Sequence, residues 1–104
     1  MIILTDRMET TAGGIGKALE WAQRLYDHIQ KSGLAPGQFW LIRPHTGRRN
    51  DMVAFVGEYD SVTEYDEFQK KMFADSGIVK LIEELRGSDW FKGTERIIYD
   101  VIKK

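Results

Sequence analysis

Apolar positions along the chain recur at two spacings, and each spacing predicts a different kind of element. Across residues 15–32 the apolar side chains follow one another at steps of three and four, which is typical of an amphipathic helix. Gly33 comes directly after this pattern, where a positive φ is often needed, so we expect the helix to end there. Ser61 and Glu64 form a capping box ahead of a second helical pattern, and a shorter third pattern precedes Gly87. The apolar positions of these two patterns are Val62, Tyr65, Phe68 and Met72, followed by Ile78, Leu81, Ile82 and Leu85.

Four other segments are rich in β-branched and aromatic residues, as strands are. They are residues 2–8, 38–45, 51–60 and 95–102. Residues 46–50, with the sequence TGRRN, join the second and third of these segments as a hairpin. The predicted order is therefore β-α-β-β-α-(α)-β. This order indicates an α+β fold, a ferredoxin-like plait in which helices cover one face of a four-stranded antiparallel sheet.

The second face of this sheet is also predicted to be apolar. Period-two alternation sends Phe39 and Leu41 to one face and Trp40 and Ile42 to the other. The third and fourth strands alternate in the same way, with apolar residues on both faces. One layer of helices covers only one face, and a solvated face should be polar. We therefore expect a second copy of the chain to cover the other face, so that the protein is a homodimer.

Composition excludes several kinds of partner and chemistry but does not indicate an activity. The 104 residues fit a single domain spanning 1–104, and the net charge of -1 gives no reason to expect nucleic acid or a membrane surface as partner. The absence of cysteine excludes disulfides and thiolate chemistry. The apolar run at the start is too short for a signal peptide, and no window resembles a membrane span. We expect a soluble, cytoplasmic protein.

The strand and helix order, together with RPHTGRRNDMVAFVGEYDSVTEYDEF (43–68) and GTERIIYDVI (93–102), resembles the dimeric α+β barrel superfamily. Within it the chain is most similar to small bacterial NIPSNAP-like proteins, many of which are uncharacterised. The resemblance implies two sheets packed face to face, with a possible cavity between each sheet and its helices. The superfamily also contains cofactor-independent monooxygenases and haem-degrading oxygenases. The latter use an Asn on the first strand, where this chain offers Thr5, Asp6 and Arg7, so haem degradation is not expected.

Two other motifs fail on inspection. The segment TAGGIGKA does not complete a phosphate-binding loop, because Thr11 and Ala18 stand where glycine and a hydroxyl residue are required. His28 and His45 are the only histidines, and no carboxylate lies at a metal-ligand spacing from them. We expect neither a metal nor a cofactor.

The polar segment RPHTGRRND, beginning at Arg43, leaves two interpretations open. It could be a solvated hairpin tip that touches a partner subunit. It could instead recognise an anionic or carbonyl-bearing small molecule, with Arg43 as its anion partner and His45 as an acid or base. If alternation continues through the strand, both side chains share a face with Leu41. Trp40 is either an interface residue or part of a ligand cavity.

Two functions therefore remain. The chain could be a homodimeric module that binds a small ligand between sheet and helices, with Trp40, Arg43 and His45 as candidate ligand-binding residues. The alternative is a cofactor-independent monooxygenase or isomerase acting on an aromatic or polyketide-like substrate. For the enzyme, the candidate catalytic residues are His45, Tyr59 and Tyr99.

Overall fold

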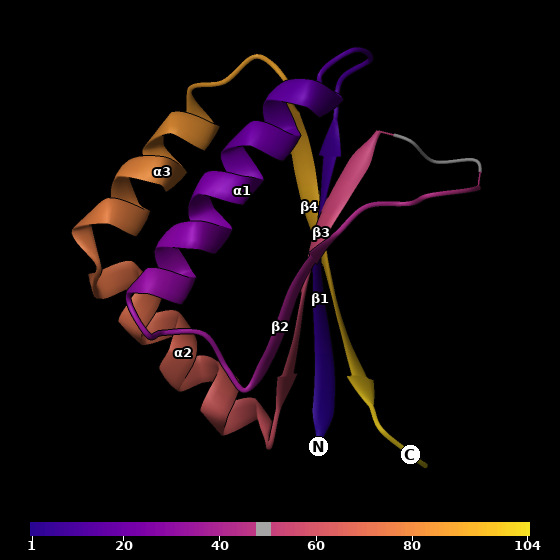
Figure 1. Ribbon diagram of the computed structural model, residues 1–104, viewed down its shortest axis with the longest axis vertical. Helices are drawn as coiled ribbons and strands as arrows, with labels where there is room; N and C mark the ends of the chain where they lie inside the picture. Colours follow the sequence, from indigo (N-terminus) through magenta and orange to yellow (C-terminus); the bar gives the residue numbers. More distant parts are fainter. Residues whose placement is uncertain (48–50) are drawn as a thin grey trace.

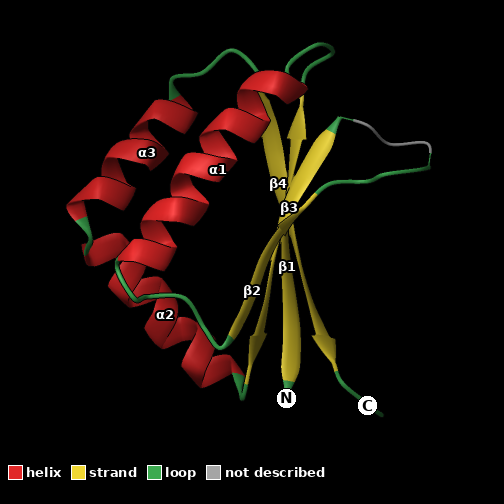
Figure 2. Cartoon of the chain, in the orientation of Figure 1, coloured by secondary structure: helices red, strands yellow, loops and turns green. Residues whose placement is uncertain are grey.

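The first strand of the chain lies inside a four-stranded antiparallel sheet, in the strand order β2-β3-β1-β4. Residues 1–47 and 51–104 are described by a computed structural model of the protein. Three helices cover one face of the sheet, which confirms the α+β, ferredoxin-like fold (Figure 1, Figure 2). The elements are β1 (Ile2–Thr10), α1 (Ile15–Lys31), β2 (Gln38–Ile42), β3 (Met52–Tyr59), α2 (Val62–Ala74), α3 (Ser76–Arg86) and β4 (Phe91–Asp100).

The helices begin and end close to where the sequence predicts. After α1 the chain turns at Gly33, whose φ of 69° is easily reached only by glycine. The Ser61 side chain caps α2 by accepting a hydrogen bond from the Glu64 backbone N–H at 3.2 Å, and the Glu64 carboxylate accepts one from the Asp60 N–H at 2.8 Å. The Ser61 half of the predicted capping box is thus confirmed, whereas the Glu64 side chain bonds the N–H one residue before the cap. Asp75 caps α3 in the same manner, accepting from Ile78 at 3.1 Å.

Two strand boundaries differ from the prediction for a physical reason. The sequence predicts that β2 continues to residue 45, but its pairing with β3 ends at Ile42, because Pro44 has no N–H to donate to the ladder. The sequence predicts β4 over 95–102, but the strand pairs with β1 from Phe91 to Asp100. β1, the strand that pairs with β4, begins at Ile2, so the ladder ends at Asp100. Beyond it, the Val101 N–H donates a hydrogen bond to the Met1 carbonyl.

The predicted alternation of side chains holds along the strands. The helix-facing row of the two central strands is mainly apolar, but Asp6 lies near its middle, opposite Phe55, and Tyr59 brings a hydroxyl group at one end. α1 packs over this face through one buried stripe. The buried members of the stripe are Ala18, Trp21, Ala22, Leu25 and Ile29.

The face of the sheet away from the helices is only partly polar. Large apolar side chains are exposed there, among them Trp40 at 42% and Tyr99 at 49%. The register places Trp40 beside Val56, and Thr5 lies between Val56 and Ile97. We call this surface the outer face and the helix-covered surface the inner face.

Part of the predicted hairpin falls on residues that the structure does not describe. Arg48, Arg49 and Asn50 of the predicted hairpin lie outside the described residues. Among the residues that are described, no helix combines the length and the apolar character needed to cross a membrane.

Candidate functional site

A cavity of about 180 Å³ lies between the inner face of the sheet and the helices. Its walls are mainly apolar and aromatic side chains from the helices and from all four strands. Asp6 and Arg96 are the charged residues of its lining. The full lining is Leu4, Asp6, Met8, Trp21, Leu25, Ile29, Phe39, Phe55, Gly57, Tyr59, Phe68, Met72, Ile82, Leu85, Thr94 and Arg96.

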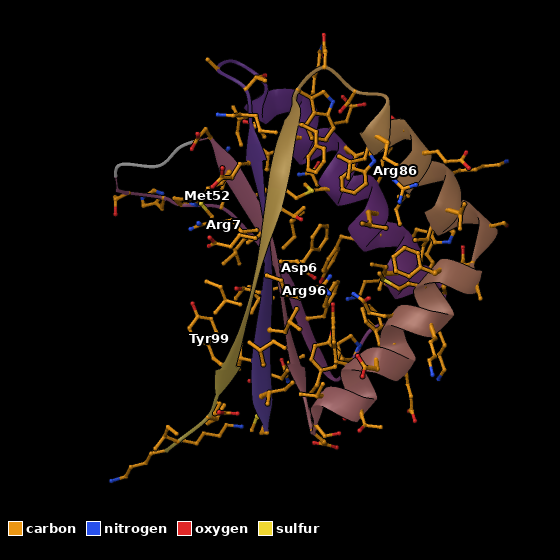
Figure 3. The ribbon with its side chains drawn as sticks, turned by 180° about the vertical axis from the view of Figure 1, so that it is seen from behind. Asp6, Arg7, Met52, Arg86, Arg96 and Tyr99 are labelled. Atoms are coloured by element: carbon orange, nitrogen blue, oxygen red, sulfur yellow. The ribbon has the colours of Figure 1, made fainter. Side chains whose placement is uncertain are left out.

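Asp6 and Arg96 form an ion pair at the β4 side of this cavity. They are direct register partners on adjacent strands, and the Arg96 Nε donates to Asp6 Oδ1 at 2.7 Å. Figure 3 shows both side chains on the side of the sheet that faces the helices. Arg96 also lies over the ring of Tyr65, 5.2 Å from its centroid, in a cation–π contact. The Arg96 side chain is 46% exposed and that of Asp6 29%, so the pair marks the border between cavity and solvent.

The electrostatics of the pair keep Arg96 charged. Burial lowers the pKa of Arg96, but the hydrogen bond and negative charge of Asp6 outweigh it, and the net shift is upward. The second carboxylate oxygen of Asp6, Oδ2, has no hydrogen bond among the described residues. It remains able to accept a hydrogen bond from a molecule in the cavity.

Tyr59 adds a third polar group, and Gly57 determines where its ring lies. The Tyr59 ring leans along β3 over Gly57, so that a Cβ on that glycine would meet ring atom Cε2 at 2.8 Å and the hydroxyl at 2.9 Å. Only 3% of Tyr59 is exposed, and no described residue forms a hydrogen bond with its hydroxyl. Burial is the main cause that raises the pKa of Tyr59 well above its usual range. The hydroxyl therefore stays protonated at neutral pH and is a donor rather than a base.

Tyr65 supports the Tyr59 ring from outside the lining of the cavity. Tyr65 packs edge-on against Tyr59 with ring centroids 5.1 Å apart, and its hydroxyl accepts a hydrogen bond from the Gln69 side chain. Burial raises the pKa of Tyr65 to about 12. Opposite them, the Trp21 Nε1 donates to the Leu81 carbonyl at 2.7 Å, which ties α1 to α3 behind the cavity. The wall is thus held by hydrogen bonds as well as by packing.

The residues singled out from the sequence are not brought together. Tyr59 lines the cavity, whereas Trp40 and Tyr99 project from the outer face, as Figure 3 shows for Tyr99. Arg43 and His45 follow the end of β2, so they do not continue the row of Leu41. Both are exposed and border a separate depression. That depression is lined by Ile15, Arg43, Pro44, His45 and Met52.

The sequence prediction of the site does not include Asp6, Arg96 or Gly57, although the sequence carries a signal for Asp6. Asp6 interrupts the apolar alternation of Ile2, Leu4 and Met8 on the buried face of its strand. A charged residue on a buried face needs a partner of opposite sign. Nothing in the local sequence of the fourth strand shows that Arg96 is that partner, because the register of the β1–β4 pair decides it.

Two other polar pairs join the helices to one another. His28 Nε2 lies 2.8 Å from Asp75 Oδ1 and joins α1 to the α2–α3 junction. Arg24 and Glu84 form an exposed ion pair between α1 and α3. Within residues 1–47 and 51–104, no three His, Cys, Asp or Glu side chains gather in a way that could hold a metal ion.

This fold is that of ferredoxin-like α+β proteins of known structure. By sequence, no family model and no curated protein matches the chain. Among solved structures, the chain is similar to Atu4242 of Agrobacterium tumefaciens, a NIPSNAP family protein of unknown function. The TM-score is 0.73 at 20% identity, covering 94% of this chain and 85% of the other.

Two further structures extend the comparison. An antibiotic biosynthesis monooxygenase superposes with a TM-score of 0.70 at 12% identity, covering 99% of this chain and 100% of the other. A dimeric ferredoxin-like protein from an uncultured marine organism superposes with a TM-score of 0.65 at 16% identity, covering 100% and 97%. The structural neighbours thus include NIPSNAP proteins and proteins with the monooxygenase fold, as the sequence resemblance implied. At these identities the similarity establishes the fold alone.

Proposed function

We propose that this protein binds a small, largely apolar molecule in the cavity between its sheet and its helices. The observation that carries the proposal is the combination of an apolar cavity with convergent polar groups at one side of it. Asp6, Arg96 and Tyr59 supply an acceptor, a cation and a donor to the same space. Binding sites commonly show this pattern, in which apolar walls supply affinity and a few polar groups supply orientation.

The experiment is a search for ring-sized ligands by ligand-detected NMR and isothermal titration. Binding should be competitive among ligands and should be lost when the cavity is filled by Leu25→Trp, a residue of the α1 wall. The matched control is Gln23→Trp, on the same helix but exposed. Binding that survives Leu25→Trp in a folded protein would place the ligand elsewhere and contradict the proposal.

We also propose that the outer face joins two copies of the chain. Ile42 and Ile97 are 49% and 37% exposed there, beside Trp40 and Tyr99, and a monomer rarely leaves so many large apolar side chains in water. One structural neighbour is a dimeric protein. A face-to-face pair would cover this surface on both copies at once.

Two adjacent residues of β4 test this arrangement. Ile97 lies on the outer face and Ile98 on the inner face, and their exposed fractions of 37% and 44% are similar. In light scattering, the wild type should show twice the chain mass. Ile97→Asp should reduce it to one chain mass or cause aggregation, because a carboxylate would be buried without a partner. Ile98→Asp should leave the dimer intact. Equal effects of the two variants would contradict the assignment of the outer face.

A second candidate function is catalysis without a cofactor, as an isomerase or a monooxygenase. The observation that favours it is a carboxylate in the cavity close to neutral, protonated tyrosines. In an isomerase, Asp6 would take a proton from a carbon next to a ligand carbonyl, and the Tyr59 hydroxyl would donate to the enolate oxygen. The proton would then return to a different carbon, which balances the reaction without an oxidant.

Proton exchange provides a direct test of this second function. Small cyclic ketones in D₂O should exchange their α-protons faster with the wild type than with Asp6→Asn, measured by proton NMR. Tyr59→Phe should slow the exchange while leaving ketone binding in place. An exchange rate equal to that in buffer alone would contradict the isomerase function and leave ligand binding as the proposed function.

A further inference from the structure

We infer that the cavity selects a neutral, single-ring molecule whose polar end both donates and accepts a hydrogen bond. This inference rests on the proposed function, since it names the class of ligand for the same cavity. Two properties of the site carry it, the size of the space and the balance of its charges.

The size of the cavity favours one ring. An apolar cavity of about 150 Å³ is enough to bind benzene, whereas drug-sized ligands occupy about 300–1,000 Å³. The volume of about 180 Å³ found here lies close to the lower of these values. The walls are apolar and aromatic side chains, among them Phe39, Phe55 and Phe68, which suit the faces and edges of a ring. A fused three-ring compound would not fit without movement of the helices.

The charges of the lining cancel. Asp6 and Arg96 are its charged residues, they carry opposite signs, and they are hydrogen-bonded to each other. Tyr59 is neutral at pH 7, as tyrosine ordinarily is, and burial raises its pKa further. An anionic ligand would leave two negative groups beside one guanidinium, and a cationic ligand would leave two positive groups beside one carboxylate. The charged group of either ligand would also lose part of its hydration beside this partly exposed pair.

A neutral polar group uses the site without disturbing the ion pair. Asp6 Oδ2 has no hydrogen bond among the described residues and can accept one from a ligand hydroxyl or amide N–H. The Tyr59 hydroxyl is similarly unbonded and can donate to a ligand oxygen. Hydrogen bonds to charged groups are stronger than those between neutral groups, so the bond to Asp6 gives the larger share of the selectivity.

The test uses a set of probes that share one ring and differ in the group attached to it. Toluene, benzyl alcohol and benzamide are neutral, benzoate is an anion and benzylamine is a cation. With the wild type, benzyl alcohol and benzamide should bind about tenfold more tightly than either ion, measured by isothermal titration and ligand-detected NMR. A three-ring alcohol, 9-anthracenemethanol, should not bind.

Removing one member of the ion pair should change which charged probe binds more tightly. Asp6→Asn leaves the Arg96 charge uncompensated, so the affinity for benzoate should rise about tenfold and exceed that for benzylamine. Arg96→Met leaves the Asp6 charge uncompensated, so the affinity for benzylamine should rise and that for benzoate should fall. The controls are Glu84→Gln and Arg24→Met, which remove the same charges from an exposed pair outside the cavity and should leave the order of probes unchanged. If Asp6→Asn does not fold, Arg96→Met tests the same argument with the opposite sign.

The outcomes separate this inference from the proposed function. If rings bind but benzoate or benzylamine matches the neutral probes in the wild type, the inference is overturned while ligand binding stands. The same holds if 9-anthracenemethanol binds as well as benzyl alcohol. If no ring binds at millimolar concentration, the proposed function and the inference fall together.

Discussion

Replacement of Gly57 by alanine tests the packing that creates the cavity. Gly57 is buried in the middle of β3, between Leu4 of β1 and Phe39 of β2. Its φ is not positive, so the backbone itself accepts an L-residue. An added Cβ, however, would lie 2.8 Å from Tyr59 Cε2 and 2.9 Å from the Tyr59 hydroxyl, closer than real Cβ contacts. The Tyr59 ring must therefore move.

Two effects of opposite sign decide the result. Within a strand, alanine is favoured over glycine by about 0.5–1 kcal/mol, because glycine loses more backbone freedom on folding. Forcing a methyl group into a packed core costs about 1–3 kcal/mol. The steric effect is larger here, because the Tyr59 ring is only 3% exposed and is held by Tyr65 and Phe68. We expect Gly57→Ala to lower the free energy of unfolding by about 1–2 kcal/mol.

The assay is urea unfolding followed by tryptophan fluorescence, with Gly93→Ala as the matched control. Gly93 lies in β4, its φ is not positive, and nothing lies within 4 Å of an added Cβ. Gly93→Ala should be neutral or stabilising. In a Tyr59→Leu background, Gly57→Ala should cost less than it does in the wild type, because the clash is with the ring. If Gly57→Ala is as stable as Gly93→Ala, Tyr59 does not lie over Gly57 and the described shape of the cavity is wrong.

Three further predictions follow from capping and ionisation. Ser61→Ala should lower the free energy of unfolding in urea by about 1 kcal/mol, because the Glu64 N–H loses its hydrogen-bond acceptor. Ser61→Asp should lower it far less, and equal losses for the two variants would contradict the capping role. Asp75 has a pKa lowered from 3.8, chiefly by the hydrogen bond from the Ile78 N–H and then by His28. The unfolded state therefore binds the proton more readily, and the stabilisation is present above pH 3.8 and lost as the pH falls through the lower folded value. Urea midpoints of Asp75→Asn should accordingly fall less between pH 5 and 2.5 than those of the wild type, and parallel curves would contradict this. Burial raises the pKa of Tyr65 from 10.0 to about 12. The stabilisation of the folded protein by this shift is therefore complete below pH 10 and is lost as the pH rises through 12. Tyr65→Phe should reduce the loss of stability at alkaline pH, and an unchanged slope of stability against pH would refute the shift.

The sequence by itself determined the elements and their faces. The helical stripe of residues 15–32 and the capping box at Ser61 depend on neighbours within a few residues, so local spacing is sufficient to show them. The same is true of the alternation that separates Phe39 from Trp40 on β2. It predicted two apolar faces of the sheet, and the structure places these side chains as expected.

The tertiary structure alone decided the candidate site. Asp6 and Arg96 are 90 residues apart in the chain, and they meet because antiparallel register pairs these two positions of β1 and β4. A shift of β4 by one residue would turn Arg96 to the outer face while Asp6 stayed on the inner face. Alternation along β2 could not place Arg43, because it applies only while the strand continues, and pairing with β3 ends before that residue. Periodicity along one strand fixes the face of a side chain, whereas the partner across the sheet depends on a register set by the packing of the whole domain.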